Sequence, residues 1–230
     1  DFGSFGDLFE NFFSGGQARG GRPSNKGADR EVQIAIDFAD AVSGKRLDLA
    51  LEKLAQCEHC TGNGAETGSK NITCKECGGT GQVIKTANSL FGRVQQRVVC
   101  PTCRGSGEIP EKPCRTCSGE GRTKRKITVT IDVPAGIQTG QTLRFRGEGD
   151  AGRKNAEAGD LFVHILVEDD RRFIRDGDDI RSSFVVPALD AMLGTEVSLE
   201  TVHGSVRLVI PEATQPGQVL LIKGKGMPVL

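Results

Sequence analysis

The chain contains, between residues 57 and 121, four copies of one pattern: Cys57-Glu-His-Cys60-Thr-Gly62-Asn-Gly64, Cys74-Lys-Glu-Cys77-Gly-Gly79-Thr-Gly81, Cys100-Pro-Thr-Cys103-Arg-Gly105-Ser-Gly107 and Cys114-Arg-Thr-Cys117-Ser-Gly119-Glu-Gly121. Together they use all 8 cysteines of the chain. Two intervening residues allow a tight turn to point both sulfurs of a pair at one metal ion. Four such pairs therefore predict two tetrahedral, four-cysteine zinc sites.

The glycines at the second and fourth positions after each pair fit the same interpretation. Glycine tolerates positive φ, so the backbone can curl around the ion and direct N–H groups at the sulfurs. His59 lies inside the first pair and is another potential ligand. Because the cysteines already fill both sites, we expect it to be an exposed spacer.

Two other uses of the cysteines remain open. A thioredoxin-like redox pair needs only one Cys-x-x-Cys, which would make the chain a thiol–disulfide oxidoreductase or isomerase. A disulfide framework is typical of small secreted chains. Four copies with the same Gly-x-Gly tail, long cysteine-free stretches and no signal peptide favour metal binding over both.

The order of the pairs suggests which of them share an ion. Residues 47–54 and 126–133 both have strand-like patterns and flank the cysteine module. If the first and fourth pairs share one ion, these strands stay neighbours, and residues 83–99 form a hairpin-like arm near the second ion. Sequential pairing would leave the ends of the module free to separate, at an additional entropic cost. We favour the nested arrangement.

Composition limits the partners of the chain. It has 30 basic and 30 acidic side chains among 230 residues, and this neutral balance argues against nucleic acid or an anionic membrane surface as the main partner. The basic run at residues 122–126 is a local exception that fits a solvated strand entrance. Apolar stretches long enough to span a membrane are absent from the sequence. Unoxidised, paired cysteines suit a reducing compartment.

The pattern along the chain predicts several small β units. Residues 1–28 form a Gly/Phe-rich linker whose aromatic residues have helical spacing, so a short amphipathic helix is an alternative. Residues 30–36 alternate as a strand, residues 37–44 suggest a helical turn with a glycine cap, and residues 161–167 form an almost continuous apolar strand. Leu47, Leu49 and Leu51 share one face of their strand.

An internal repeat divides the rest of the chain. The first copy is Val133-Pro-Ala-Gly-Ile-Gln138-Thr-Gly140-Gln-Thr-Leu-Arg-Phe-Arg-Gly147-Glu-Gly149, and the second is Ile210-Pro-Glu-Ala-Thr-Gln215-Pro-Gly217-Gln-Val-Leu-Leu-Ile-Lys-Gly224-Lys-Gly226. Proline ends a strand, Gly-Gln reverses the chain, and a further strand follows. We expect two tandem β-domains, the second of them cut short before its equivalent of residues 161–167.

These features make the chain resemble the type I (class A) co-chaperones of the DnaJ (Hsp40) family. The four repeats, the run Gly147-Glu-Gly-Asp-Ala-Gly152 and the run Lys223-Gly-Lys-Gly-Met-Pro228 carry the resemblance. It implies a mainly β fold with two tandem β-sandwich-like carboxy-terminal domains and a zinc module inserted in the first. The boundaries are 1–28 for the linker, 29–56 with 122–168 for β-domain I, 57–121 for the module and 169–230 for β-domain II.

The resemblance also implies the site residues. Cys57, Cys60, Cys114 and Cys117 would hold the first Zn²⁺, and Cys74, Cys77, Cys100 and Cys103 the second. Extended segments of unfolded clients would add as a strand to the first β-domain, beside a pocket that includes Leu49, Leu51 and Val163. Leucines on one strand face also fit an ordinary core.

By the same resemblance the protein is a co-chaperone and not an enzyme. It would bind unfolded polypeptides, prevent their aggregation and deliver them to a DnaK-type (Hsp70) partner. The J-domain motif His-Pro-Asp, which triggers that partner's ATPase, is missing, because His59, His164 and His203 precede Cys, Ile and Gly. The full-length protein would form a homodimer in the cytosol of a bacterium, or inside a plastid or mitochondrion.

Overall fold

A computed structural model describes residues 25–89 and 92–229 of the chain. Their elements are β1 (Arg30–Ile36), α2 (Phe38–Ser43), β2 (Lys45–Gln56), β3 (Asn71–Thr73), β4 (Gln82–Ser89), β5 (Gly92–Val99), β6 (Glu108–Pro110), β7 (Arg122–Val133), β8 (Thr142–Phe145), the 3-10 turn η1 (Arg153–Asn155), β9 (Leu161–Val167), β10 (Ile174–Asp176), β11 (Asp179–Arg181), α3 (Ala188–Leu193), β12 (Thr195–Thr201) and β13 (Gly204–Ile210). The chain is mainly β, as predicted. The aromatic stretch expected to be a linker or helix lies almost wholly outside the described residues.

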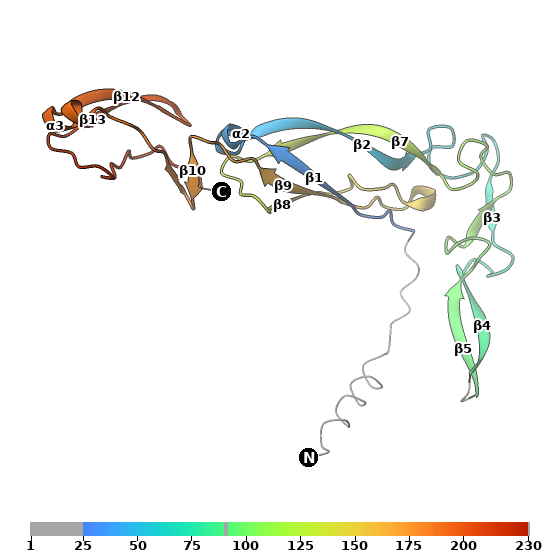
Figure 1. The fold of residues 1–230 in the computed structure, drawn as a ribbon. Coiled ribbons are helices and arrows are strands. Elements are labelled where there is room, and N and C mark those ends of the chain that lie inside the picture. Colours follow the sequence, from blue (N-terminus) through green and yellow to red (C-terminus); the bar gives the residue numbers. More distant parts are fainter. Residues whose placement is uncertain (1–24, 90–91, 230) are drawn as a thin grey trace, which may run out of the picture. The chain divides into compact units, whose positions relative to one another are not determined.

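The first β-domain has two layers. One is the sheet β1-β9-β8, in which β9 pairs parallel with β1 and antiparallel with β8, and the other is the pair β2-β7 (Figure 1). Side chains from both layers share one core. Its buried members from these strands are Ile36, Leu51, Val129, Ile131, Val133, Leu161, Val163 and Ile165. The layers therefore form a small β-sandwich.

The sequence pattern explains these strands. β1 alternates between half-buried and exposed residues because one face, with Val32 and Ile34, packs against the core and the other faces solvent. β9 is apolar almost throughout because it is the central strand, with Leu161, Val163 and Ile165 buried. The predicted helical turn is α2, which ends at Gly44 with φ of 74°. Its residues Ala41 and Val42 are buried in the same core.

The loop between β8 and β9 is fixed by two buried carboxylates. Asp160 accepts hydrogen bonds from Arg144 Nε at 2.9 Å and from the Gly147 N–H at 2.9 Å. Asp150 accepts one from the Leu54 N–H at 2.9 Å, and the Ala151 N–H donates to the Leu54 carbonyl at 2.7 Å. Asp150 and Ala151 of the Gly147–Gly152 run thus bond to the end of β2.

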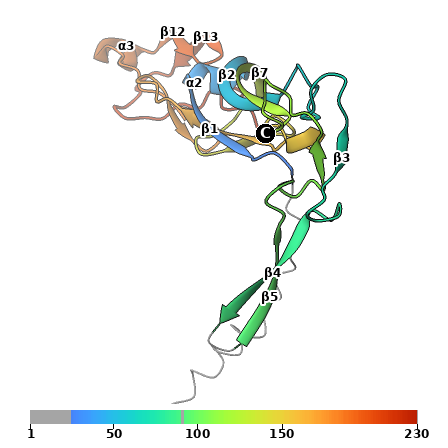
Figure 2. The same ribbon diagram turned by 90° about the vertical axis from the view of Figure 1, so that its right-hand side faces the viewer.

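Residues 83–99 form the arm that the sequence predicted. β4 and β5 pair antiparallel from Gln82↔Val99 to Ser89↔Gly92. Figure 2 shows them as a two-stranded hairpin. A second short pair, β3 with β6, has the register Ile72↔Ile109.

The second copy of the repeat keeps its turn but not all of its strands. Gln138 and Gln215 each donate a backbone N–H to the side chain of the glutamine three residues later, at 2.9 and 3.1 Å. However, the strand predicted after Gly217 is wrong, since residues 218–222 have no strand assignment. Their counterpart β8 is held by β9, and the described part of the second copy has no equivalent of β9. Val219 and Leu221 are accordingly 91% and 77% exposed.

Contacts divide the described chain into two units. One consists of residues 25–28, 53–125 and 149–159, and holds the cysteine module. The other consists of residues 29–52, 126–148 and 160–229, and holds the apolar core. Within the second unit, Phe173 stacks on Phe38 with ring centroids 6.3 Å apart, and the Arg175 side chain donates to the Ile137 carbonyl at 2.6 Å. Residues 173–175, which begin the segment after β9, are thus anchored to the first β-domain's core.

Candidate metal centres

The first and fourth cysteine pairs come together where β2 ends and β7 begins. The Cys57 and Cys114 sulfurs lie 4.0 Å apart, and the Cys60 and Cys117 sulfurs lie 3.7 Å apart. All four side chains are buried, and they form a cluster that contains only these cysteines. This quartet is called site 1 below.

The second and third pairs form an equivalent quartet, called site 2. The Cys74 and Cys100 sulfurs are 3.8 Å apart, and those of Cys77 and Cys103 are 3.7 Å apart. The strand pairs β3-β6 and β4-β5 flank it, and Val83 and Ile109 pack against it. The structure therefore groups the cysteines in the nested way.

The sulfur separations suit a tetrahedral metal. A tetrahedron with about 2.3 Å from the metal to each thiolate has edges of about 3.8 Å. The four cross-pair distances, 3.7 to 4.0 Å, match that value. Bonded disulfide sulfurs are only about 2.05 Å apart, and all eight cysteines here are free. Each buried quartet can hold a metal ion.

The glycines shape each quartet in two ways. All eight Gly-x-Gly glycines have positive φ, for example 84° at Gly62 and 79° at Gly64, as their spacing predicted. The N–H groups of Gly64, Gly81 and Gly121 donate to the sulfurs of Cys60, Cys77 and Cys117 at 3.2 to 3.3 Å. In addition, a Cβ on Gly64 would lie 2.5 Å from the Gly119 carbonyl oxygen. The first and fourth of the repeats, which are called knuckles below, therefore contact each other directly through their backbones.

The thiols of a quartet do not ionise together. At site 1, burial raises the pKa of Cys60 to about 12, whereas the N–H groups of Cys117 and Thr116 and the His59 ring overcome burial and lower the pKa of Cys114 to about 6. Four negative sulfurs at these distances repel one another strongly without a cation among them. The electrostatics therefore favour a divalent ion at the centre.

One residue beside each quartet was not identified as functional from the sequence. His59 is exposed, as expected of a spacer, but its Nδ1 lies 3.5 Å from the Cys114 sulfur and its Nε2 lies 3.7 Å from Glu66 Oε1. At site 2, Glu76 Oε2 lies 3.7 Å from the Cys100 sulfur. Both occupy the third position of a Cys-x-x-Cys pair, and only this shared position in the repeats could have suggested them.

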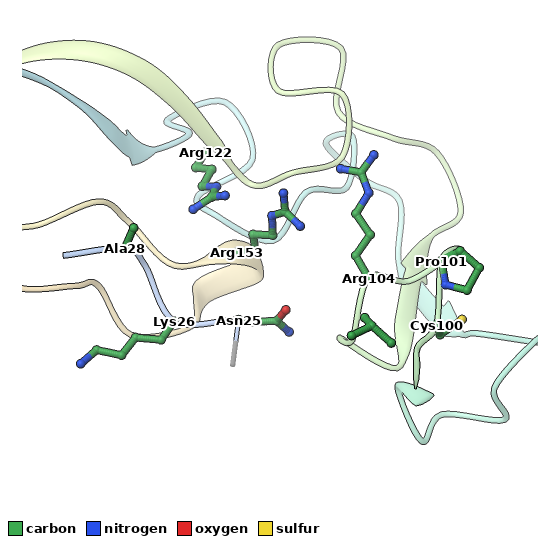
Figure 3. Close-up of a pocket in the computed structure, with 9 residues that line it drawn as sticks. Asn25, Lys26, Ala28, Cys100, Pro101, Arg104, Arg122 and Arg153 are labelled. Atoms are coloured by element: carbon green, nitrogen blue, oxygen red, sulfur yellow. The ribbon is translucent and has the colours of Figure 1, made fainter. Parts of the chain in front are cut away.

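A cluster of arginines lies close to both quartets. Arg104, Arg122 and Arg153 line a pocket of about 510 Å³ (Figure 3). Glu120 lies among them, 2.7 Å from Arg104, 3.4 Å from Arg153 and 3.7 Å from Arg122. Arg122, expected at a solvated strand entrance, is largely buried and donates to the Ala151 carbonyl at 2.8 Å. The chain itself thus supplies an anion to this cluster.

The three residues of the expected client pocket lie in or against the apolar core. Val163 is fully buried, Leu51 is 9% exposed, and Leu49 is half-buried and packs against the same cluster. The structure brings them together across the two layers of the first β-domain. Of the three, only Leu49 keeps substantial exposure.

Fold and site together define a β-sandwich chain with an inserted four-knuckle cysteine module. The family model of the DnaJ C terminal domain matches residues 30–230, and the chain belongs to this family.

Individual relatives agree with the family match. The chain is 40% identical over 215 residues to "Chaperone protein DnaJ" of Gloeobacter violaceus, covering 93% of this chain and 56% of the relative. It is 40% identical over 233 residues to that of Lactobacillus acidophilus, covering 100% and 60%. For Haloferax mediterranei the identity is 38%, covering 99% and 59%. The chain therefore spans less than two thirds of each of these relatives.

Among the described residues, none of the helices combines the length and the apolar character that crossing a bilayer requires.

Proposed function

We propose that this chain is the client-binding part of a DnaJ-type co-chaperone. It holds segments of unfolded polypeptides, prevents their aggregation, and presents them to a DnaK-type (Hsp70) chaperone. Stimulation of that partner's ATPase and homodimer formation belong to the whole protein. The observation that carries the proposal is a cysteine module of the family's pattern joined to a β-sandwich with an accessible strand edge.

The metal in this proposal is Zn²⁺, two per chain, bound by the eight cysteines as two four-thiolate sites. An all-thiolate tetrahedral site suits zinc and leaves no open coordination position, which supports a structural role. Free cysteines at these positions fit a reducing compartment, so we place the protein in the cytosol. Elemental analysis should give two zinc ions per chain. A metal-free but well-ordered chain would contradict this assignment.

The strand edge is that of β2. Among the described residues β2 pairs with β7 alone. The N–H and carbonyl of Leu54 point away from β7, because they bond to Asp150 and Ala151. Backbone groups alternate along a strand, so those of Ala50 and Asp48 point the same way. An extended client segment can pair there with any sequence, while the half-buried Leu49 contributes apolar surface.

Substitution at Ala50 tests this edge directly. Ala50 is exposed. Ala50→Pro removes the outward N–H and leaves the β7 ladder intact, since proline is tolerated at such edge positions. We expect it to weaken suppression of aggregation of an unfolded model client several-fold. Ala50→Val keeps the N–H and is the matched control. Equal holding by the two folded variants would contradict client addition at β2.

The oxidoreductase alternative predicts a different result. A redox pair requires a reactive thiolate with access to substrate, whereas all eight cysteine side chains here are buried in the two quartets. We therefore propose that the chain is not an enzyme. Thiol titration of the zinc-loaded protein should detect no fast-reacting cysteine, and turnover of a dithiol–disulfide substrate would overturn this view.

A further inference from the structure

The two quartets have the same framework but different side chains beside them, an imidazole at site 1 and a carboxylate at site 2. His59 and Glu76 are equivalent residues, each standing just before the second cysteine of its pair. Each faces the first cysteine of the partner pair: His59 Nδ1 lies 3.5 Å from the Cys114 sulfur, and Glu76 Oε2 lies 3.7 Å from the Cys100 sulfur. The two sites can thus be compared within one chain, because they differ in the residue that contacts the sulfur: His59 at site 1 and Glu76 at site 2.

At site 1 the neighbour is the imidazole of His59, which can donate a hydrogen bond through Nδ1. Glu66 fixes the ring, because it lies 3.7 Å from His59 Nε2 and is itself held by the Arg115 N–H at 2.9 Å. With a hydrogen on Nδ1, the ring directs an N–H group at the Cys114 sulfur. A zinc ion with four thiolates carries a net charge of about −2, so a donor at this place stabilises the loaded site.

At site 2 the neighbour is an anion. The Cys100 sulfur becomes a thiolate when a metal binds, and the exposed Glu76 carboxylate, 3.7 Å away, then faces another negative group. The Thr102 hydroxyl donates to Glu76 and offsets part of this charge. It does not reverse the sign of the group that faces the sulfur.

More distant charges do not distinguish the sites. Arg125 interacts electrostatically with Cys57 at site 1, but it is paired with Glu58. Lys154 interacts with Cys74 and Cys103 at site 2, while its ammonium donates to Ser106 Oγ at 2.7 Å. Each site therefore has a nearby cation that is bonded to another group, and the arginines around Glu120 are likewise paired. The direct contacts to sulfur remain the difference.

We propose that site 2 is the exchangeable metal site and gives up its ion before site 1, and that His59 and Glu76 set this order. The inference rests on the proposed zinc sites. Replacing a residue that contacts a metal ligand typically changes metal affinity by a factor of roughly 10 to 100. The rates of zinc release from site 1 and site 2 should therefore differ by roughly tenfold or more.

The experiment follows zinc release from the whole chain loaded with two ions. A chromogenic chelator reports the rate, and brief alkylation with peptide mass spectrometry identifies which cysteines become accessible. We expect a fast phase of one ion with labelling at Cys74, Cys77, Cys100 and Cys103, followed by a slow phase with labelling at the other four.

Variants at the two positions test the cause. Glu76→Gln should slow the fast phase, and His59→Asn, which keeps an N–H near the sulfur, should change the slow phase little. The exchange His59→Glu with Glu76→His should reverse the labelling order. Equal rates, earlier labelling of site 1, or an unchanged order in the exchanged variant would overturn the inference. A starting content other than two zinc ions would instead contradict the zinc assignment on which it rests.

Discussion

The Cys57 backbone N–H donates to the Gly121 carbonyl at 2.9 Å, joining the first residue of the cysteine module to its last. The reciprocal bond runs from the Cys114 N–H to the Gly64 carbonyl, also at 2.9 Å. Site 2 repeats this exchange with N–H to carbonyl bonds of 2.8 and 3.0 Å. Each metal centre is therefore enclosed by two knuckles that bond to each other through the glycine at the end of each repeat.

Because of this reciprocal contact, there is no room for a side chain at position 64. A Cβ there would lie 2.5 Å from the Gly119 carbonyl oxygen and would force the first and fourth knuckles apart. We predict that Gly64→Ala lowers the stability of the module and speeds zinc loss from site 1. Thermal unfolding and chelator kinetics measure both effects.

Gly68→Ala is the matched control for Gly64→Ala. Gly68 has φ of 86°, close to the 79° of Gly64, but nothing lies within 4 Å of its Cβ position. It should show only the cost of a left-handed alanine, about 1–2 kcal/mol. Equal losses of stability in the two variants would show that backbone strain, and not contact with the fourth repeat, explains the effect of Gly64→Ala.

Loss of one ligand should have unequal consequences at the two sites. Site 1 lies where β2 and β7 enter the module, whereas site 2 lies deeper in the inserted segment. We predict that Cys57→Ser reduces hydrogen-exchange protection of β2 and β7 more than Cys74→Ser does. Both variants lose one thiolate, so each is the control for the other. An equal loss of protection in both variants would contradict the view that site 1 holds the two ends of the module together.

Much of the metal centres could be predicted from the sequence because their chemistry is local. The spacing of each Cys-x-x-Cys-x-Gly-x-Gly repeat fixes its own turn, and the flanking strand patterns make nesting the shorter closure. The contacts of His59 and Glu76 could not be predicted, because each reaches a cysteine of another repeat. Whether a residue inside a pair faces solvent or a partner's sulfur depends on how two knuckles pack.

The same distinction explains the errors in the β-domains. β1, β7 and β9 follow from residue patterns within each strand. Residues 218–222 resemble β8 in sequence, but a strand also needs a partner, and the partner of β8 is β9. The client pocket is a similar case. The pattern places Leu49 and Leu51 on one face, but only packing decides that Leu51 is 9% exposed while Leu49 remains half-buried.

The Arg144–Asp160 pair should matter more than a surface pair. Asp160 is 6% exposed and accepts from Arg144 Nε at 2.9 Å. We predict that Arg144→Met costs about 3 kcal/mol, because it leaves a buried carboxylate with fewer partners. Arg46→Met is the control, since Arg46 and Asp132 form a pair with side chains 74% and 70% exposed, and its loss should cost less than about 1 kcal/mol. Denaturant unfolding measures the stability lost in each variant. Equal losses for Arg144→Met and Arg46→Met would contradict the prediction.

Removal of metal should unfold the module and spare the sandwich. Site 1 has a core of four cysteines only, and site 2 adds only Val83 and Ile109, so neither has apolar area sufficient to stay folded alone. The sandwich core, which includes Ile131, Val163 and Ile165, contains no cysteine. We predict that chelation abolishes amide protection across residues 57–121 but retains it in β9, because binding of structural zinc supplies the folding free energy of such segments. Restoring zinc should restore protection. Persistent protection of the module without metal would contradict its dependence on zinc. Loss of protection from β9 as well would show that the two cores do not fold as separate units.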